Sequence, residues 1–132
     1  MAESIARIRF VRIAPRKVRL VADLIRGRKV SEARDILRFT MKRAAPVLGK
    51  LLESAVANAE TAAAERRHRI DADDMVVNHI SVDGGPAFKR VQPRAQGRRT
   101  LLRKRTSHVQ LRLTGESAPI PQRGRRRSKQ GE

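Results

Sequence analysis

The segment "KRVQPRAQGRRTLLRKR" (Lys89–Arg105) is the most basic continuous stretch between the apolar segments of the chain. It holds eight basic residues and no acidic one, and Pro93 and Gly97 near its middle favour a turn. A stretch this polar cannot bury enough apolar surface to form a core. We therefore expect it to project from a folded domain that its flanks help to build.

Both flanks have the spacing of β-strands. In "MVVNHISVD" (75–83) and "SHVQLRL" (107–113) the side chains alternate, which predicts an inward face of Val76, Ile80, Val82, Val109, Leu111 and Leu113. The outward face would carry Val77, His79, Ser81, His108, Gln110 and Arg112. We expect these two strands to pair with each other.

The 26 residues between Val82 and Val109 are too many for an ordinary hairpin loop and contain too few apolar residues for another domain. The simplest geometry is a two-stranded ribbon with its tip at "QPRAQG" (92–97). At roughly ten residues per arm, it would project about 30 Å. An isolated ribbon is marginal in water, so we expect it to become ordered against a partner.

A further strand is expected near the N-terminus. In "IARIRFVRIAP" (5–15), apolar and basic residues roughly alternate, with Ile8 and Phe10 on one face and Arg7 and Arg9 on the other.

Three helices are expected between residues 15 and 63. The first starts at Pro15 and stops at Gly27, and the second is a short helix capped by Ser31. The third and central helix runs from about residue 43 to 63, starting between residues 42 and 45, because Pro46 is tolerated only in a first turn. Their apolar stripes are Val18, Val21, Leu24, Ile25, Ala33, Ile36, Leu37, Leu48, Leu51, Leu52, Ala55, Val56, Ala59 and Ala62.

Charge predicts the class of partner. The chain has 31 basic and 13 acidic residues, a net charge of +18 and a pI near 11.9. Residues 84–115 carry nine basic residues and no acidic one, whereas residues 1–83 carry 17 and 11. A segment without acids is suited to phosphates, so the partner is predicted to be a nucleic acid. Three Phe with no Tyr or Trp argue against stacking on bases and favour contact with phosphates and shape.

The other polar residues indicate no enzyme, cofactor or metal. There is no Cys, and His68, His79 and His108 are scattered. The group Asp71, Asp73 and Asp74 is more typical of a polar turn than of a Mg²⁺ site. No secretion signal or long apolar run is evident, which predicts a cytoplasmic protein without a membrane partner.

Four segments carry a family resemblance: "KVRLVADLIRG", "ANAE", "VDGGPAFKRVQPRAQGR" and "KRTSHV". Together they closely resemble the family of large-ribosomal-subunit proteins numbered twenty-two, over roughly residues 4–114. The resemblance implies an α+β fold of three helices packed on a small three-stranded antiparallel sheet, with a long protruding β-hairpin. We expect one domain over residues 1–114, including the arm 84–105, and a basic irregular tail over 115–132. The connection "AAERRHRIDADD" is more basic than is usual in the family, and the tail extends past the typical end.

The resemblance also implies a function. The chain would be a structural constituent of the large ribosomal subunit, would bind 23S ribosomal RNA and would support early subunit assembly. Its hairpin would line the nascent-polypeptide exit tunnel, with the tip close to the narrow part and to the macrolide site. The implied partners are this RNA, neighbouring large-subunit proteins and the nascent chain, without a homo-oligomer.

The residues expected to contact RNA are Arg7, Arg9, Arg16, Lys17, Arg19, Lys89, Arg90, Arg94, Arg98, Arg99, Arg103, Lys104 and Arg105. The tunnel-lining tip would be Gln92, Pro93, Arg94, Ala95, Gln96, Gly97 and Arg98, and Phe88 belongs to the adjoining arm. For Arg7, Arg9 and also Arg34, a merely solvated surface is an equally good interpretation.

Two other classes of function stay open. A DNA-compacting protein would also use basic β-ribbons, but it needs a dimer interface, for which we find no spare apolar stripe. A tight dimer that coats random duplex DNA in size-exclusion chromatography would favour this class. An enzyme acting on RNA would need an acid, base or metal constellation that we do not find.

Overall fold

Three antiparallel strands form the main sheet, in the order β1–β6–β3. The computed structural model describes residues 2–119, and in it these strands are β1 (Ala2–Val11), β3 (Val76–Gly84) and β6 (Ser107–Gly115). Strand β6 lies in the centre and alternates between buried and half-buried residues along its length, as its sequence predicts. The predicted pairing of the two flanking strands is confirmed.

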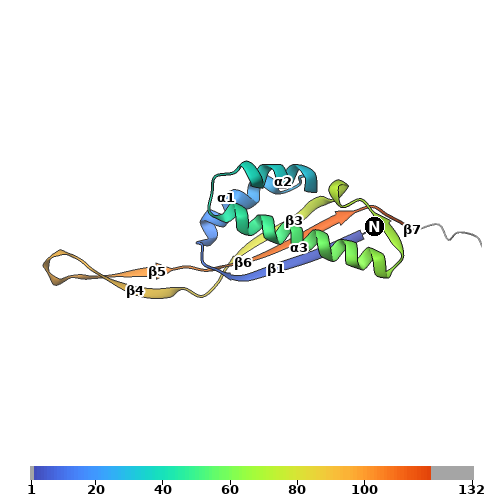
Figure 1. Ribbon diagram of the computed structural model, residues 1–132. Coiled ribbons are helices and arrows are strands. Elements are labelled where there is room, and N and C mark those ends of the chain that lie inside the picture. The colour runs from blue at the N-terminus through green and yellow to red at the C-terminus, as the bar shows by residue number, and fades with distance from the viewer. Residues whose placement is uncertain (1, 120–132) are drawn as a thin grey trace, which may run out of the picture.

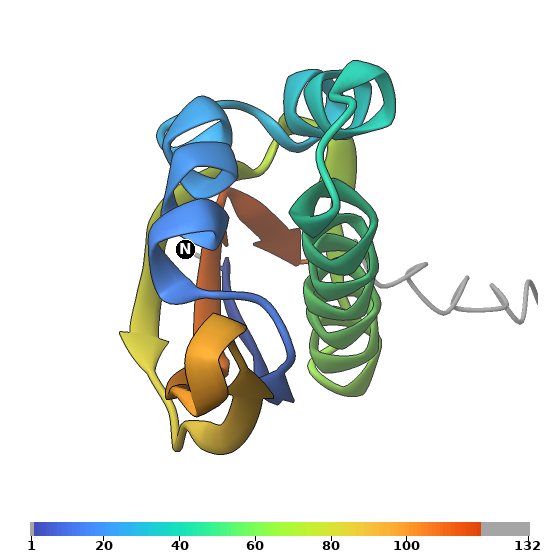
Figure 2. The same cartoon turned by 90° about the vertical axis from the view of Figure 1, so that its left-hand side faces the viewer.

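Three helices cover one face of this sheet (Figure 1). They are α1 (Pro15–Ile25), α2 (Val30–Phe39) and α3 (Ala44–Glu65). Viewed from the hairpin end in Figure 2, α1 and α3 lie side by side, with α1 packed on β3 and α3 packed on β1. The predicted α+β class and the three-helix, three-stranded arrangement are confirmed.

Helix α3 is the centre of the core, as expected. It starts at Ala44, so Pro46 falls in its first turn, where the missing N–H leaves no helical hydrogen bond unmade. Its small residues allow β1 to approach closely, and the buried Ser4 Oγ donates a 2.6 Å hydrogen bond to the Ala55 carbonyl. Leu48 and Leu52 of this helix are fully buried.

Two β-bulges change which side chains face the core. In β3, the pairing register shifts between Val77 and His79, so Val77 is buried and Val76 is only half-buried, which reverses the predicted faces at this end. In β1, the register shifts between Ile8 and Val11, and Phe10 turns outward with a φ of 58°. The prediction that Ile8 and Phe10 share one face of this strand is therefore wrong, and Val11 takes the buried position instead.

Two helical details also differ from the sequence-based expectation. Ser31 does not cap α2, because the helix already begins at Val30 and Lys29 is the N-cap residue. Leu24 is 47% exposed, and with Leu20, one turn earlier, it leaves an apolar strip on the outside of α1. The expectation that no apolar surface stripe remains is wrong for this helix, and the absence of a homo-oligomer stays a prediction.

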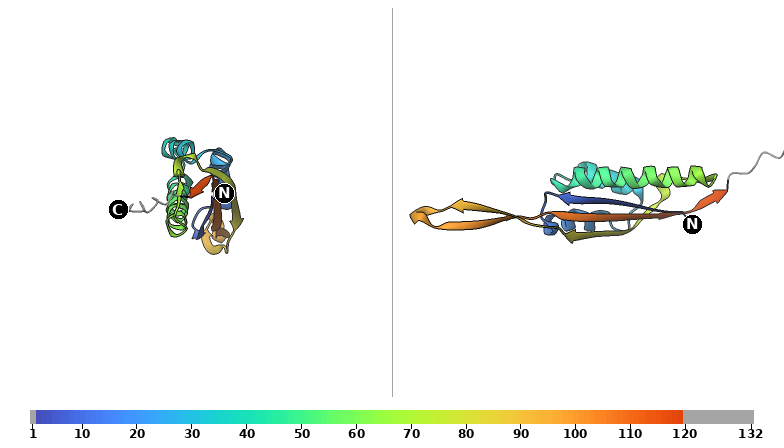
Figure 3. Two further views of the ribbon diagram at one scale, coloured as in Figure 1. Left: turned by 90° about the vertical axis from the view of Figure 1, so that its right-hand side faces the viewer. Right: turned by 90° about the horizontal axis from the view of Figure 1, so that it is seen from below.

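The basic segment forms the predicted ribbon. Strands β4 (Phe88–Pro93) and β5 (Arg99–Lys104) pair in register and extend away from the sheet, while the N-terminus lies at the opposite end of the domain (Figure 3). Each arm has six paired residues, about 20 Å of strand, rather than roughly ten. All twelve of these residues are exposed, so the ribbon has no core of its own.

A second small strand pair closes the other end of the domain. Strand β2 (His68–Ile70) pairs with β7 (Ser117–Pro119), and a 3-10 turn (Ala72–Asp74) leads into β3. The prediction that the chain is irregular from residue 115 is wrong for residues 117–119, because they form strand β7 by pairing with β2. The rest of the predicted tail, 120–132, lies outside the described residues. Within residues 2–119, none of the helices is both long enough and apolar enough to cross a bilayer.

Candidate nucleic-acid interface

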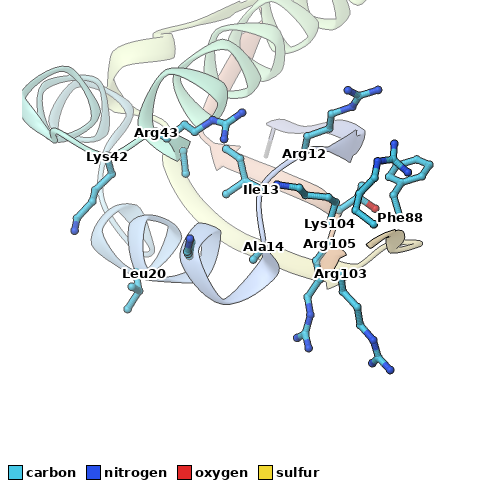
Figure 4. Close-up of a pocket in the computed structure, with 14 residues that line it drawn as sticks. Arg12, Ile13, Ala14, Leu20, Lys42, Arg43, Phe88, Arg103, Lys104 and Arg105 are labelled. Atoms are coloured by element: carbon cyan, nitrogen blue, oxygen red, sulfur yellow. The ribbon is translucent and has the colours of Figure 1, made fainter. Parts of the chain in front are cut away.

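A groove lies where the hairpin leaves the domain. Its volume is about 880 Å³, and we call it the basic groove (Figure 4). Eight basic residues and no acidic residue line it, namely Arg12, Lys17, Lys42, Arg43, Arg90, Arg103, Lys104 and Arg105. Its remaining lining is Ile13, Ala14, Leu20, Ala44, Phe88 and Thr106, so the groove combines apolar walls with a rim of positive charge.

Two helix N-termini add to this positive potential. Helices α1 and α3 both begin beside the groove, which Ala14 and Ala44 help to line. Neither first turn contains an acidic residue, and neither N-cap side chain accepts a hydrogen bond from the helix. The first N–H groups of a helix carry partial positive charge and bind anions. Pro15 and Pro46 have no N–H, and the Lys17 and Ala45 N–H groups donate to the Ala14 and Lys42 carbonyls, so these helix ends contribute positive potential rather than a set of free donors.

The structure brings some of the predicted RNA-contact residues together and separates others. Lys17, Arg90, Arg103, Lys104 and Arg105 line the basic groove. The remaining arm and tip residues follow the exposed hairpin, namely Lys89, Arg94, Arg98 and Arg99. Arg7, Arg9 and Arg16 are exposed on β1 and α1 but do not line the groove.

Three lining cations were not predicted: Arg12, Lys42 and Arg43. Arg12 lies in the same basic segment as Arg7 and Arg9, and this local charge is a signal that could have found it, although it falls outside their two-residue alternation. Lys42 and Arg43 carry no such local signal. They lie about sixty residues before Arg103 and Arg105 in sequence, and only the packing of α3 brings them to the base of the hairpin.

Two arginines have structural roles on the domain itself. The Arg19 guanidinium donates hydrogen bonds of 3.2 and 3.0 Å to the Val82 carbonyl and so ties α1 to β3. Arg34 binds both carboxylate oxygens of Glu53, at 2.7 and 3.3 Å, and Asp73 at 2.7 Å. The pKa of Arg34 is raised, chiefly by the hydrogen bond with Glu53. Arg34 is thus a clamp between helices rather than a solvated charge.

The acidic group before β3 also takes part in local structure. Asp71 accepts a 3.2 Å hydrogen bond from the Asp73 N–H and caps the 3-10 turn, while Asp73 pairs with Arg34. Among residues 2–119, no cluster of three or more His, Asp or Glu side chains could hold a metal ion.

Buried hydroxyl groups fix the base of the hairpin. Thr106 Oγ1 donates a 2.6 Å hydrogen bond to the Pro86 carbonyl, and the Gly85 N–H donates to the Thr106 carbonyl at 2.9 Å. Ser107 Oγ donates to the Ile13 carbonyl at 2.5 Å, which links β6 to the wall of the groove. The bonds of Thr106 join the two ends of the hairpin to each other, and the bond of Ser107 joins the hairpin base to the β1–α1 connection. They set the direction in which the arm leaves the domain.

We expect Gly85→Ala to lower the free energy of unfolding by about 1–3 kcal/mol, because the new methyl group overpacks a tight site. A Cβ at Gly85 would overlap Thr106 Oγ1 and lie 3.1 Å from His108 Cε1 and Nε2, and Thr106 is itself buried. Urea unfolding of the full chain measures the effect.

The matched control is Gly49→Ala in α3, where a Cβ would meet nothing within 4 Å. This change should raise stability by up to about 1 kcal/mol, because alanine favours a helix interior. Equal unfolding midpoints for Gly85→Ala and the unmodified chain would show that the hairpin base is not tightly packed.

The tip is a short loop held by backbone geometry. The pair Pro93 and Arg99 closes it, and the Arg94 N–H donates a 2.7 Å hydrogen bond to the Arg98 carbonyl. Gly97 has a φ of 69°, a conformation that glycine adopts without strain. The predicted turn at Pro93 and Gly97 is confirmed. The tip residues are all exposed, and their loop lies at the end of the arm away from the domain (Figure 1).

Comparison with known proteins gives a consistent result. The model of the family described as Ribosomal protein L22p/L17e matches residues 6–114. The large ribosomal subunit protein uL22 of Rubrobacter xylanophilus is 53% identical over 113 residues, which cover 85% of this chain and 85% of the relative. The protein of the same name from Syntrophotalea carbinolica is 50% identical over 107 residues, which cover 81% of this chain and 93% of the relative. Because the family match spans the hairpin and the domain that carries it, the chain belongs to the ribosomal protein L22p/L17e family.

Proposed function

We propose that the basic groove and the hairpin bind the phosphate backbone of 23S ribosomal RNA. As a member of its family, the chain is a protein of the large ribosomal subunit, with a structural role in translation. The observation that carries the proposal is the convergence of eight cations from separate segments, with no acidic residue, at two uncapped helix N-termini.

No acidic side chain within residues 2–119 forms an ion pair with the cations that line the groove. The ion pairs seen within residues 2–119 join Arg26, Arg28, Arg34 and Arg112 to acidic partners, and none of these residues lines the groove. Like charges held close together repel one another, so an anion that enters the groove removes an unfavourable interaction as well as adding a favourable one. A polyanion such as RNA gains further because it releases counterions.

The exposed hairpin extends this interface. None of its twelve paired residues is buried, so we expect its ordering to be stabilised by a partner. We propose that RNA surrounds the arm, that its tip (92–98) lines the nascent-polypeptide exit tunnel, and that the globular part contacts neighbouring large-subunit proteins. RNA binding by both parts of the molecule fits an early role in subunit assembly, in the cytoplasmic pool of ribosomes.

A salt titration tests the groove. The combined variant Arg43→Gln, Arg103→Gln and Arg105→Gln should bind large-subunit RNA more weakly, and its slope of log affinity against log salt should be less steep by about three, because each substitution removes one cation that pairs with a phosphate. Filter binding with RNA transcribed in vitro measures both. The matched control is Arg38→Gln, Arg66→Gln and Arg69→Gln, which removes the same charge from exposed positions outside the groove.

Equal reductions of the slope in the two triple variants would show that net charge, rather than the groove, determines binding. A slope near zero for the unmodified chain would contradict phosphate-driven binding altogether.

A further inference from the structure

The aromatic residues of this chain are all on its surface. Phe10, Phe88 and Phe39 are 59%, 44% and 79% exposed, and the core consists of aliphatic side chains and Met75. A large aromatic ring gains more from burial than most side chains do, so an exposed ring is favourably covered by an external partner. The small number of aromatic residues predicts no general stacking on bases, but the position of each ring determines whether it could stack on a single base.

Phe88 lies inside the basic groove. It is the first residue of β4, directly opposite Lys104 of β5, and Arg90 follows on the same face of the ribbon. Figure 4 shows Phe88 and Lys104 at one end of the groove, Leu20 and Lys42 at the other, and Ile13 between them. The ring is therefore an apolar surface surrounded by cations, with no acidic residue in the lining beside it.

The other two rings have different surroundings. Phe10 makes an edge-on contact with the His108 ring, with centroids 5.0 Å apart, and its N–H donates to His108 Nδ1 at 3.1 Å. Phe39 ends α2, and neither Phe10 nor Phe39 lines the groove. Only Phe88, among the three aromatic residues, combines a half-exposed ring with nearby cations that could hold phosphates.

We propose that Phe88 is a stacking platform for an unpaired nucleobase, and that the neighbouring cations of the basic groove hold the phosphates of the same nucleotide. This inference rests on the proposed RNA binding and narrows its target. Bases inside a continuous duplex are stacked on one another, so their faces cannot reach the ring. The groove should therefore select RNA with a bulged or looped-out nucleotide over a fully paired helix.

The dimensions and chemistry of the groove suit such a nucleotide. A volume of about 880 Å³ lies within the range of sites that enclose small molecules. A base offers an apolar π-face to Phe88, and its phosphates offer negative charge to Arg90 and Lys104, which share the Phe88 face of the ribbon. An acidic peptide could satisfy the cations, but it would leave the ring without a planar partner.

A pair of RNA probes tests the proposal with the full chain. One is a short duplex with a single unpaired 2-aminopurine, and the other is the same duplex without it. The unmodified chain should bind the bulged duplex at least about fivefold more tightly and should quench the 2-aminopurine fluorescence, since a stacked base is worth a factor of this order. Phe88→Leu should abolish both the preference and the quenching, while keeping an apolar side chain at this exposed position.

Two further variants make the test specific to the ring and to its place. Phe88→Tyr keeps an aromatic face and should retain the preference and the quenching. Phe39→Leu removes an exposed ring outside the groove and should bind both probes as the unmodified chain does.

Equal affinity of the unmodified chain for the two duplexes overturns the stacking site, even where salt-dependent RNA binding persists. The site is also overturned if Phe88→Leu keeps the preference, or if it weakens binding to both probes by the same factor. If neither duplex is bound in a salt-dependent manner, the proposed RNA binding fails together with it.

Discussion

Leu52→Ala is expected to lower the free energy of unfolding by about 2–5 kcal/mol, because it leaves a cavity in the centre of the core. Leu52 is 0% exposed on α3, the helix that packs against both β1 and α2. A domain of this size has a total stability of only about 5–15 kcal/mol, so the decrease is a large fraction. Urea denaturation followed by circular dichroism measures it.

The matched control is Leu24→Ala, the same chemical change at an exposed position of α1. It should alter stability by about 0.5 kcal/mol or less. Similar decreases in the two variants would contradict the assignment of α3 as the centre of the core.

Replacing Val91–Arg99 by a Gly-Gly turn should separate folding from function. Every residue removed is exposed, and Phe88, Arg90 and the groove side of β5 remain, so the unfolding midpoint should stay nearly unchanged. If the tip lines the exit tunnel, large subunits that contain this variant should show changed nascent-chain stalling or macrolide sensitivity. Thermal unfolding of the isolated chain and stalling assays on purified ribosomes measure the two effects.

A large drop in the midpoint would mean that the arm contributes to the stability of the domain. Normal stalling and an unchanged drug response, in ribosomes shown by mass spectrometry to contain the variant, would place the tip away from the tunnel lumen.

Local patterns predicted the elements and their order well. The alternation in "SHVQLRL" predicted the central strand with its correct inward face, and Pro46 located the start of α3. The patterns failed at the bulges in β1 and β3, where a single extra residue reverses the faces. They also missed β7, because a strand of three residues is defined by its partner β2 rather than by its own sequence.

A small aliphatic core and an arm without acidic residues follow from the amino-acid order alone, because periodicity and charge are properties of neighbouring residues. The gathering of Lys42, Arg43, Arg103 and Arg105 around one groove, with Phe88 beside them, depends on the folded arrangement of the elements. It could not be predicted, because the packing of α3 on the sheet sets the distance between segments that are far apart in the chain. The exposure of apolar side chains such as Phe88 likewise depends on which surfaces the packing of the helices on the sheet leaves uncovered.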